Sequence, residues 1–352
     1  MSLATPGWFA IHALWTGAVI AGVVALALAV LNDRRARLRH VVAYVGLLLM
    51  VALPLGVTLT TLDLFTPAAR MGATDVVENT VGLPTFVEWR ARIVICAALI
   101  WGAGLAVFAL RVGTAWRRMR RVQRAARVEA AATIREAIAQ LEPQLGVTQP
   151  VNVYESTAAE VPMVFGVRRS TILLPQEAST NLHPEQLKGV LAHELAHVRR
   201  RDYAANLLQV VAEAAIWFHP AARWLSRRIR IEREYCCDDE AIRIGADPAD
   251  YARALARLED ARHDCPLVIA ASSGTLLDRI RRIVGQPRRV LTPVRAAVTL
   301  LGAIGLAAAI ATLAQVVPPG IPLDAKLRTR RPGPPGPVMA PPGPSFPKTA
   351  TR

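Results

Sequence analysis

The amino-acid sequence predicts a membrane α-helical protein with four transmembrane helices and a mainly helical α+β domain on the cytoplasmic side. Three observations lead to this fold class. Of the 352 residues, 53% are hydrophobic, yet the formal net charge is +15, a combination that fits poorly in one soluble globule. Four apolar stretches reach the roughly 20 residues that a helix needs to cross a bilayer. Basic residues crowd beside these stretches, as they do in membrane proteins with several spans.

The four apolar stretches are predicted to be membrane spans rather than buried helices of a soluble core, because none contains an internal Asp, Glu or Lys. They cover Trp8–Leu31, Val41–Leu62, Ile93–Val112 and Ala296–Val317. Residues 1–7, ahead of the first span, contain no Lys or Arg and so lack the charged start of a signal peptide. We therefore expect the first span to be retained in the mature protein.

The positions of the basic residues predict the topology. Arginines cluster beside the spans, at Arg34, Arg35, Arg37 and Arg39, at Arg117, Arg118, Arg120 and Arg121, and at Arg279, Arg281, Arg282, Arg288 and Arg289. We interpret them as membrane-topology charge, which disfavours direct nucleic-acid binding. The first cluster places its loop in the cytoplasm and the N-terminus outside. The expected parts are residues 1–112 with three spans, 113–290 as a cytoplasmic domain, 291–317 as the fourth span, and 318–352 as a disordered, Pro/Gly-rich external tail.

Within the cytoplasmic domain, the sequence predicts one long helix, two short strands and a series of helices. The elements expected are a helix over Ala115–Gln140 that ends near Pro143, strands over Val151–Tyr154 and Ser170–Leu174, and helices from Pro184 onward, over Ala204–Phe218 and over Ala221–Ile244. The pair His219-Pro220 should separate the last two helices, because the residue before a proline avoids helical geometry.

The strongest signal for chemistry is the sequence His193-Glu194-Leu195-Ala196-His197. Positions four apart lie on one face of a helix, so both imidazoles can bind a single metal ion. Glu194 is then placed to take a proton from an attacking water rather than to coordinate. Chance would give this motif in only about one such chain in a hundred. The sequence therefore predicts one Zn²⁺ per chain in an open site of the kind that zinc hydrolases use.

A third protein ligand is needed, and zinc hydrolases commonly supply a glutamate. Glu234 is the best candidate because Asp238 lies one turn further along the same predicted helix, where it could orient a ligating histidine. Glu232 and Asp239 are the competing carboxylates, and spacing alone does not exclude an ordinary charged helix face. The neighbouring Cys236 and Cys237 are predicted to be small buried residues rather than ligands, and no disulfide is expected.

Several motifs in order carry a resemblance to a known family. Besides the two metal motifs, these are Val161-Pro162-Met163-Val164-Phe165-Gly166, Leu173-Leu174-Pro175 and Trp217-Phe218-His219-Pro220. Together they resemble the membrane metalloprotease portion of the BlaR/MecR-type antibiotic sensors, metallopeptidase family 56, over roughly residues 1–315. The resemblance implies a gluzincin-like zinc peptidase of the bacterial inner membrane in which His193, His197 and Glu234 bind zinc, Glu194 is the general acid/base and Asp238 supports the site.

The resemblance also implies that Ile172, Leu173 and Leu174 form an edge strand on which a peptide substrate pairs, although an ordinary core strand is the alternative. Separately, hydrolysis needs a donor for the developing oxyanion, and His219 is a candidate for it, although a core or interfacial histidine is the favoured interpretation. Asp202, which follows the metal helix, is either a support for the site or simply an acid at a helix end.

The expected function is regulated cleavage of a protein substrate in the cytoplasm, by analogy a transcriptional repressor, with self-cleavage as an additional activity. Only about 35 residues follow the fourth expected span, too few for the external penicillin-binding domain of those sensors, so direct acylation by a β-lactam is not expected. Two alternatives remain. One is a membrane quality-control or processing protease with a similar metal site, and the other is a non-catalytic receptor with structural zinc, which has no need of Glu194.

Overall fold

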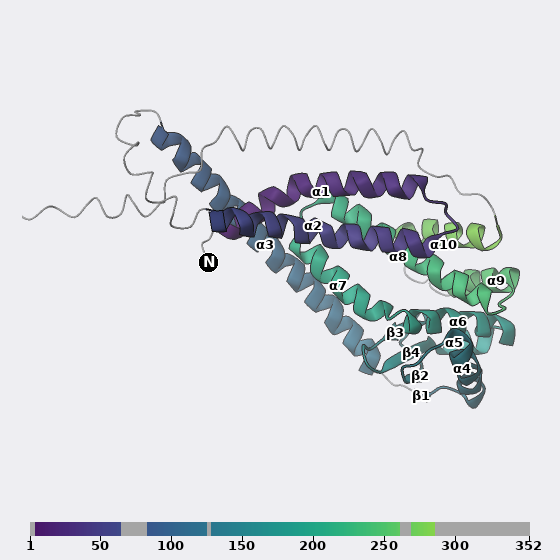
Figure 1. Cartoon of the computed structure of the whole chain (residues 1–352). Coiled ribbons are helices and arrows are strands. Elements are labelled where there is room, and N and C mark those ends of the chain that lie inside the picture. The colour runs from purple at the N-terminus through teal and green to yellow at the C-terminus, as the bar shows by residue number, and fades with distance from the viewer. Residues whose placement is uncertain (1–3, 65–82, 125–127, 261–268, 286–352) are drawn as a thin grey trace, which may run out of the picture.

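A computed structural model describes residues 4–64, 83–124, 128–260 and 269–285 (Figure 1). Three helices open the chain: α1 (Ala4–Val30), α2 (Ala36–Leu64) and α3 (Leu83–Arg124). By length and composition all three could cross a membrane, over Thr5–Val30, Ala36–Thr60 and Arg92–Arg124. They coincide with the first three expected spans. The fourth expected span and the expected tail lie outside the described residues.

The three long helices form the frame on which the rest of the chain is built. α1 and α2 run side by side, while α3 crosses them near one end and then diverges (Figure 1). Helix α7 (Asp202–Ala215) lies in the angle between α2 and α3, and α8 (Pro220–Arg243) runs along α2 (Figure 1). One hydrophobic cluster joins these helices, and it contains Ala13, Leu47, Met50, Ala212, Ile216, Leu225 and Ile229.

Because of this cluster, α7 and the first half of α8 are packed against the expected spans rather than held apart in a separate domain. Tyr44 of α2 donates a hydrogen bond to the carbonyl of Ala205 at 2.7 Å, and Trp101 of α3 donates one to that of Ala215 at 2.8 Å. Both acceptors belong to α7. Residues 113–290, expected to form one cytoplasmic unit, therefore include two helices that lie alongside the membrane-length helices.

The small sheet has four strands in the order β1-β2-β4-β3. They are β1 (Val128–Glu129), β2 (Val151–Ser156), β3 (Met163–Phe165) and β4 (Ser170–Pro175). β2 and β4 are parallel, with Val151 opposite Ser170, and β3 is antiparallel to β4, with Met163 opposite Leu173. The expectation that Ile172, Leu173 and Leu174 form an edge strand is wrong, because β4 pairs on both sides and these side chains are fully buried. The edge strands are β1 and β3.

The expected single helix over Ala115–Gln140 is also wrong. α3 ends at Arg124, β1 follows, and α4 covers Ala132–Leu145. The interruption has a physical cause, since Val128 and Glu129 pair with Glu155 and Tyr154 in the sheet. The apolar face of α4, made of Ile134, Ile138, Leu141 and Leu145, then packs into the domain core.

The remaining helices are α5 (Gln176–Asn181), α6 (Pro184–Arg199), α9 (Pro248–Asp260) and α10 (Ile269–Ile283). A second hydrophobic core lies between them and the sheet, with Leu141, Ile172, Leu174, Leu191, Leu195, Ala241 and Tyr251 among its members. α6 runs through the middle of this core, so its position relative to α8 is fixed by packing on several sides.

Candidate metal centre

Helix α6 presents the His-Glu-x-x-His motif on the opposite side from its core contacts. Its start is fixed by Pro184 in the first turn and by a capping box between His183 and Gln186. Leu191 and Leu195 are fully buried in the domain core. His193 and His197 lie one turn apart and line a pocket of about 360 Å³. The helical period of the sequence is therefore what directs both imidazoles to the same side.

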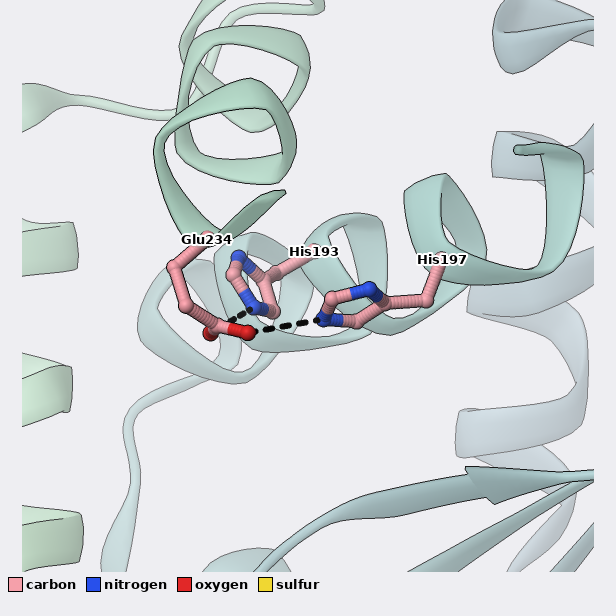
Figure 2. Close-up of side chains that lie close together, drawn as sticks. All are labelled: His193, His197 and Glu234. Carbon is pink, nitrogen blue, oxygen red and sulfur yellow. Dashed lines mark ion pairs between the residues drawn. The ribbon is translucent and has the colours of Figure 1, made fainter. Parts of the chain in front are cut away.

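The structure brings His193, His197 and Glu234 together (Figure 2). Nε2 of His193 lies 3.5 Å from Oε2 of Glu234, and Nε2 of His197 lies 3.9 Å from Oε1. The two imidazole rings are nearly perpendicular, with centroids 4.8 Å apart. Ligand atoms about 2.0–2.1 Å from a tetrahedral zinc ion are about 3.3 Å from one another. The two nitrogens and one carboxylate thus fit a single zinc ion with small side-chain adjustments.

The other ring nitrogen of each histidine has a partner that can fix its tautomer. Nδ1 of His197 lies 2.8 Å from Oδ2 of Asp202. Nδ1 of His193 lies 2.8 Å from the Tyr251 hydroxyl and 3.2 Å from Oδ1 of Asp238. A proton held at Nδ1 leaves the lone pair of Nε2 free for a metal. Asp202, left open by the sequence, therefore lies beside one ligand, and Asp238 lies beside the other.

The ionisation of these groups follows from their contacts. Burial lowers the pKa of His193, but hydrogen bonds to Asp238 and Glu234 outweigh it and raise the pKa to about 9. Burial raises the pKa of Glu234, but the hydrogen bond from His193 and the nearby charges of His197 and Arg279 hold it well below its usual value. Glu234 and Asp238 are therefore carboxylates, and without metal a proton is shared within the site.

Of the three carboxylates that spacing allowed as the third ligand, only Glu234 faces the histidines. Glu232 is fully buried on another side of α8, where its Oε1 lies 2.9 Å from Arg39 and 2.8 Å from Arg228. The Asp239 side chain is 47% exposed and forms an ion pair with Arg282 at 2.5 Å. Glu234 and Asp238 lie one helical turn apart in α8, so both face α6. This placement selects Glu234 as the candidate for the third ligand.

Glu194 lines the same pocket beside the two histidines, with Val161, Met163 and Val164 from the segment around β3 on the facing wall. Tyr203, Glu234 and Arg279 also line it. A carboxylate next to a metal-binding face, in a pocket bordered by a sheet edge, is arranged to act as a base on a water that attacks an extended chain.

The expectation that His219 stabilises an oxyanion is wrong. His219 caps the start of α8, where Nδ1 accepts a hydrogen bond from the backbone N–H of Ala221 at 3.2 Å. Its Nε2 lies 3.1 Å from the carbonyl oxygen of Leu14 in α1. Glu234 is 15 positions further along the chain, which at 1.5 Å per residue of α8 is about 22 Å away. His219 is thus the interfacial histidine that the sequence analysis favoured over an oxyanion role.

Cys236 and Cys237 are both buried, as expected. Sγ of Cys237 lies 3.3 Å from Nδ1 of His197 and 3.7 Å from Oδ2 of Asp202. These three residues form a second possible group of ligand atoms. Burial raises the pKa of the Cys237 thiol well above its usual value, which disfavours the thiolate that a metal requires.

Two site residues were missed by sequence reasoning. Tyr251 comes from α9 and Arg279 from α10, and both line the pocket. Arg279 binds Asp238 through two hydrogen bonds, at 2.6 and 3.0 Å. Arg279 was counted in a basic cluster, and Tyr251 stands in no recognisable motif. The sequence offered one signal for Arg279: it lies three positions before Arg282, on one face of a helix that follows the metal motif.

Comparison with known families agrees with this geometry. The sequence matches the family described as BlaR1 peptidase M56 over residues 9–283, which includes all the residues of the metal centre. The chain belongs to the peptidase M56 family. The match begins in α1 and ends in α10, so the membrane-length helices and the metal-binding domain are both part of the family pattern.

Individual relatives of this M56 chain are more distant. The regulatory protein BlaR1 of Bacillus licheniformis is 34% identical over 90 residues, 26% of this chain and 15% of that protein. The methicillin resistance mecR1 protein of Staphylococcus aureus strain Mu50 is 30% identical over 94 residues, 27% of this chain and 16% of that protein. A protease HtpX homolog of Persephonella marina is 27% identical over 179 residues, 40% of this chain and 62% of that protein. The matches thus span about a sixth of the length of the first two relatives.

Proposed function

We propose that this member of the M56 family is a membrane-bound zinc endopeptidase. The observation that carries the proposal is the convergence of the two His-Glu-x-x-His imidazoles on Glu234, with the Nε2 atoms 3.5 and 3.9 Å from its carboxylate. His193, His197 and Glu234 would hold one Zn²⁺. A bound zinc ion at such a site supplies a Lewis acid for the scissile carbonyl and lowers the pKa of a bound water to about 7.

Glu194 is the proposed general acid/base. It lines the pocket beside both histidines, where its carboxylate can take a proton from the attacking water. The same carboxyl group can then deliver that proton to the leaving amine, so that the carboxylate is regenerated at the end of the cycle. Asp202 and Asp238 hold the imidazoles from behind and take no part in the proton transfer.

We propose that the substrate binds along β3, one of the two edge strands of the sheet. β3 pairs with β4 on one side, and Val161, Pro162, Met163 and Val164 line the pocket. An extended peptide can add to such an edge through main-chain hydrogen bonds, with side chains in alternating directions. This strand replaces Ile172–Leu174 in that role. Main-chain pairing suits an endopeptidase, because it requires an unfolded segment rather than a particular terminus.

The substrate proposed first is a cytoplasmic transcriptional repressor, with self-cleavage as a second reaction. Its support is the similarity to the BlaR1 regulatory protein and the mecR1 resistance protein. The arginines beside the first two membrane-length helices support a metal centre on the cytoplasmic side of the bacterial inner membrane and an N-terminus outside. The alternative, a quality-control or processing protease, is supported by the longer match to the HtpX homolog.

The proposed function is tested with purified protein in detergent. Glu194→Gln should keep about one zinc per chain and lose about 10²- to 10⁴-fold in peptide hydrolysis, because only the base is removed. Glu234→Ala should bind zinc far more weakly. Glu185→Gln, on the exposed first turn of the same helix, is the matched control and should retain both properties. Undiminished hydrolysis by Glu194→Gln would contradict the enzyme proposal, and full zinc occupancy in Glu234→Ala would contradict the ligand set.

A further inference from the structure

A chain of hydrogen bonds connects the metal-binding face of α6 to helices α9 and α10. Nδ1 of His193 lies 2.8 Å from the Tyr251 hydroxyl. That hydroxyl lies 2.8 Å from Oδ1 of Asp238. Arg279 reaches the same carboxylate with Nη2 at 2.6 Å from Oδ1 and Nε at 3.0 Å from Oδ2. Four side chains from four helices therefore meet behind one proposed zinc ligand.

The donor and the acceptor of each hydrogen bond between Arg279, Asp238, Tyr251 and His193 follow from the chemistry of these groups. A guanidinium has donors and no acceptor, so Arg279 donates and keeps Asp238 as an accepting carboxylate. The Tyr251 hydroxyl must therefore donate its proton to Asp238. Its oxygen is left to accept, from the Nδ1–H of His193 at 2.8 Å and more distantly from Nη2 of Arg279 at 3.5 Å. This order keeps a proton on Nδ1, so that Nε2 of His193, which faces Glu234, is the nitrogen that can give up its proton and offer a lone pair to a metal.

Burial makes this arrangement rigid. Tyr251 and Asp238 are each only 1% exposed, so neither can exchange its partner for bulk water without disrupting the core. Asp238 is a buried carboxylate in contact with the positive charge of Arg279, and such a charge is tolerated only when it is paired. Nη1 of Arg279 also lies 3.4 Å from Oε2 of Glu234, so the same guanidinium stands beside a second residue of the site.

We propose that Tyr251 and Arg279 are positioning residues that hold His193 in the tautomer and orientation required for zinc binding. This inference rests on the proposed function, because it assigns these residues a role toward the zinc ligand. It makes α9 and α10, which contribute no ligand themselves, part of the metal centre.

Helix α10 provides a matched control one turn further along. Arg282 is bound to the same helix α8, through Asp239 at 2.5 and 2.8 Å, and its guanidinium lies over the Tyr235 ring at 5.0 Å. Tyr235 is itself buried, in a separate cluster with Ala36 and Cys236. Arg282→Ala removes the same group from α10 as Arg279→Ala, and Tyr235→Phe removes a buried tyrosine hydroxyl from α8, both without touching the hydrogen bonds behind His193.

The test measures zinc affinity of the full-length protein in detergent by competition with a chromogenic chelator, together with the visible absorption spectrum of the cobalt-loaded protein. Tyr251→Phe and Arg279→Ala should each weaken zinc binding by about 10- to 100-fold and alter the cobalt spectrum. Arg279→Lys should recover part of the loss, because it restores the charge but not the two-point contact. Arg282→Ala and Tyr235→Phe should bind zinc within about twofold of the unaltered protein.

The outcomes separate this inference from the function on which it rests. If the unaltered protein binds one zinc and Tyr251→Phe binds it equally well with an unchanged cobalt spectrum, the positioning role is overturned while the peptidase proposal stands. An equal loss in Tyr235→Phe or Arg282→Ala would also overturn it, since the effect would then be general loosening of α8 and α10. If the unaltered protein binds no zinc, both proposals fall. Tyr251→Phe and Arg279→Lys decide the question even if Arg279→Ala does not fold.

Discussion

Cys237 can be interpreted either as a metal ligand or as a small buried side chain of the core. Its sulfur lies 3.3 Å from Nδ1 of His197 and 3.7 Å from Asp202, close enough for the three to be considered as metal ligands. A zinc ion bound there would lie at Nδ1 of His197, on the side of the imidazole that faces away from the pocket. Asp202 already lies 2.8 Å from the same nitrogen, which leaves Cys237 the role of a small apolar side chain in the core.

We predict that Cys237→Ala retains one zinc per chain with unchanged affinity. Loss of the buried sulfur should cost about 1 kcal/mol of stability, which corresponds to roughly one buried methylene. The measurement is metal analysis by mass spectrometry combined with thermal unfolding. Cys236→Ala serves as the control, because it removes the same group from the neighbouring buried position. A zinc deficit confined to Cys237→Ala would assign the metal to the His197, Asp202 and Cys237 group instead.

At the scale of residues, the sequence was most informative where chemistry requires a local spacing. His193, Glu194 and His197 follow from one helical turn, and Glu234 with Asp238 from another. Tyr251 and Arg279 could not be predicted in this way, because they reach the site through the packing of α9 and α10. Arg279 and Arg282 were assigned to membrane topology, although each forms an ion pair with an aspartate of α8.

Helices α1, α2 and α8 are joined at a buried arginine that the sequence also assigned to topology. The Arg39 side chain is only 2% exposed and donates to the carbonyl oxygens of Leu28 and Leu31, at 2.6 and 2.7 Å, near the end of α1. It also pairs with Glu232 of α8 at 2.9 Å. One guanidinium thus ties the turn between α1 and α2 to the helix that carries Glu234.

Arg39→Ala should lower stability by about 3–5 kcal/mol, because it leaves buried acceptors without their donor and weakens the pairing of a buried carboxylate. The measurement is the midpoint of thermal unfolding in detergent. Arg35→Ala changes the same charge in the same turn at an exposed position, so its midpoint should stay near that of the unaltered protein. Equal midpoints for the two variants would mean that charge near the membrane, rather than the buried contacts, determines stability.

At the scale of elements, two of the four strands and most of the helices were predictable, and the neighbours of the strands were not. Val151–Tyr154 and Ser170–Leu174 were expected as strands and are found within β2 and β4. The order of strands depends on long-range pairing, which no local pattern contains. The uninterrupted apolar run Ile172–Leu174 is itself typical of a strand buried on both faces. Such a run fits the interior position of β4 better than an edge.

At the scale of the whole molecule, the proposed zinc ion would connect α6, which lies in the domain core, to α8, which packs along the membrane-length helices. Binding to the folded state alone stabilises a protein by about 2.7 kcal/mol when the free ligand is 100 times its dissociation constant. We therefore predict that a chelator lowers the thermal midpoint and that added Zn²⁺ restores it.

Glu234→Ala is the control for this prediction, because it lacks a proposed ligand and its midpoint should not respond to zinc. The comparison is made in one detergent and at one protein concentration, by tryptophan fluorescence during heating. A zinc-dependent shift of the same size in Glu234→Ala would show that the ion stabilises the protein from another site.

The packing of α8 gives the molecule a mechanical property. This 24-residue helix has Leu225 and Ile229 among the membrane-length helices, Tyr235 against Ala36 of α2 and Glu234 in the metal centre, so a movement of α2 would be carried directly to a proposed zinc ligand. Over the roughly 21 Å from Pro220 to Glu234, a tilt of about 3° would carry the carboxylate about 1 Å, twice the ~0.5 Å within which a catalytic group must be held. If the proposed peptidase is active, we expect a change in helix crossing that tilts α8 by this amount to lower its rate of peptide hydrolysis.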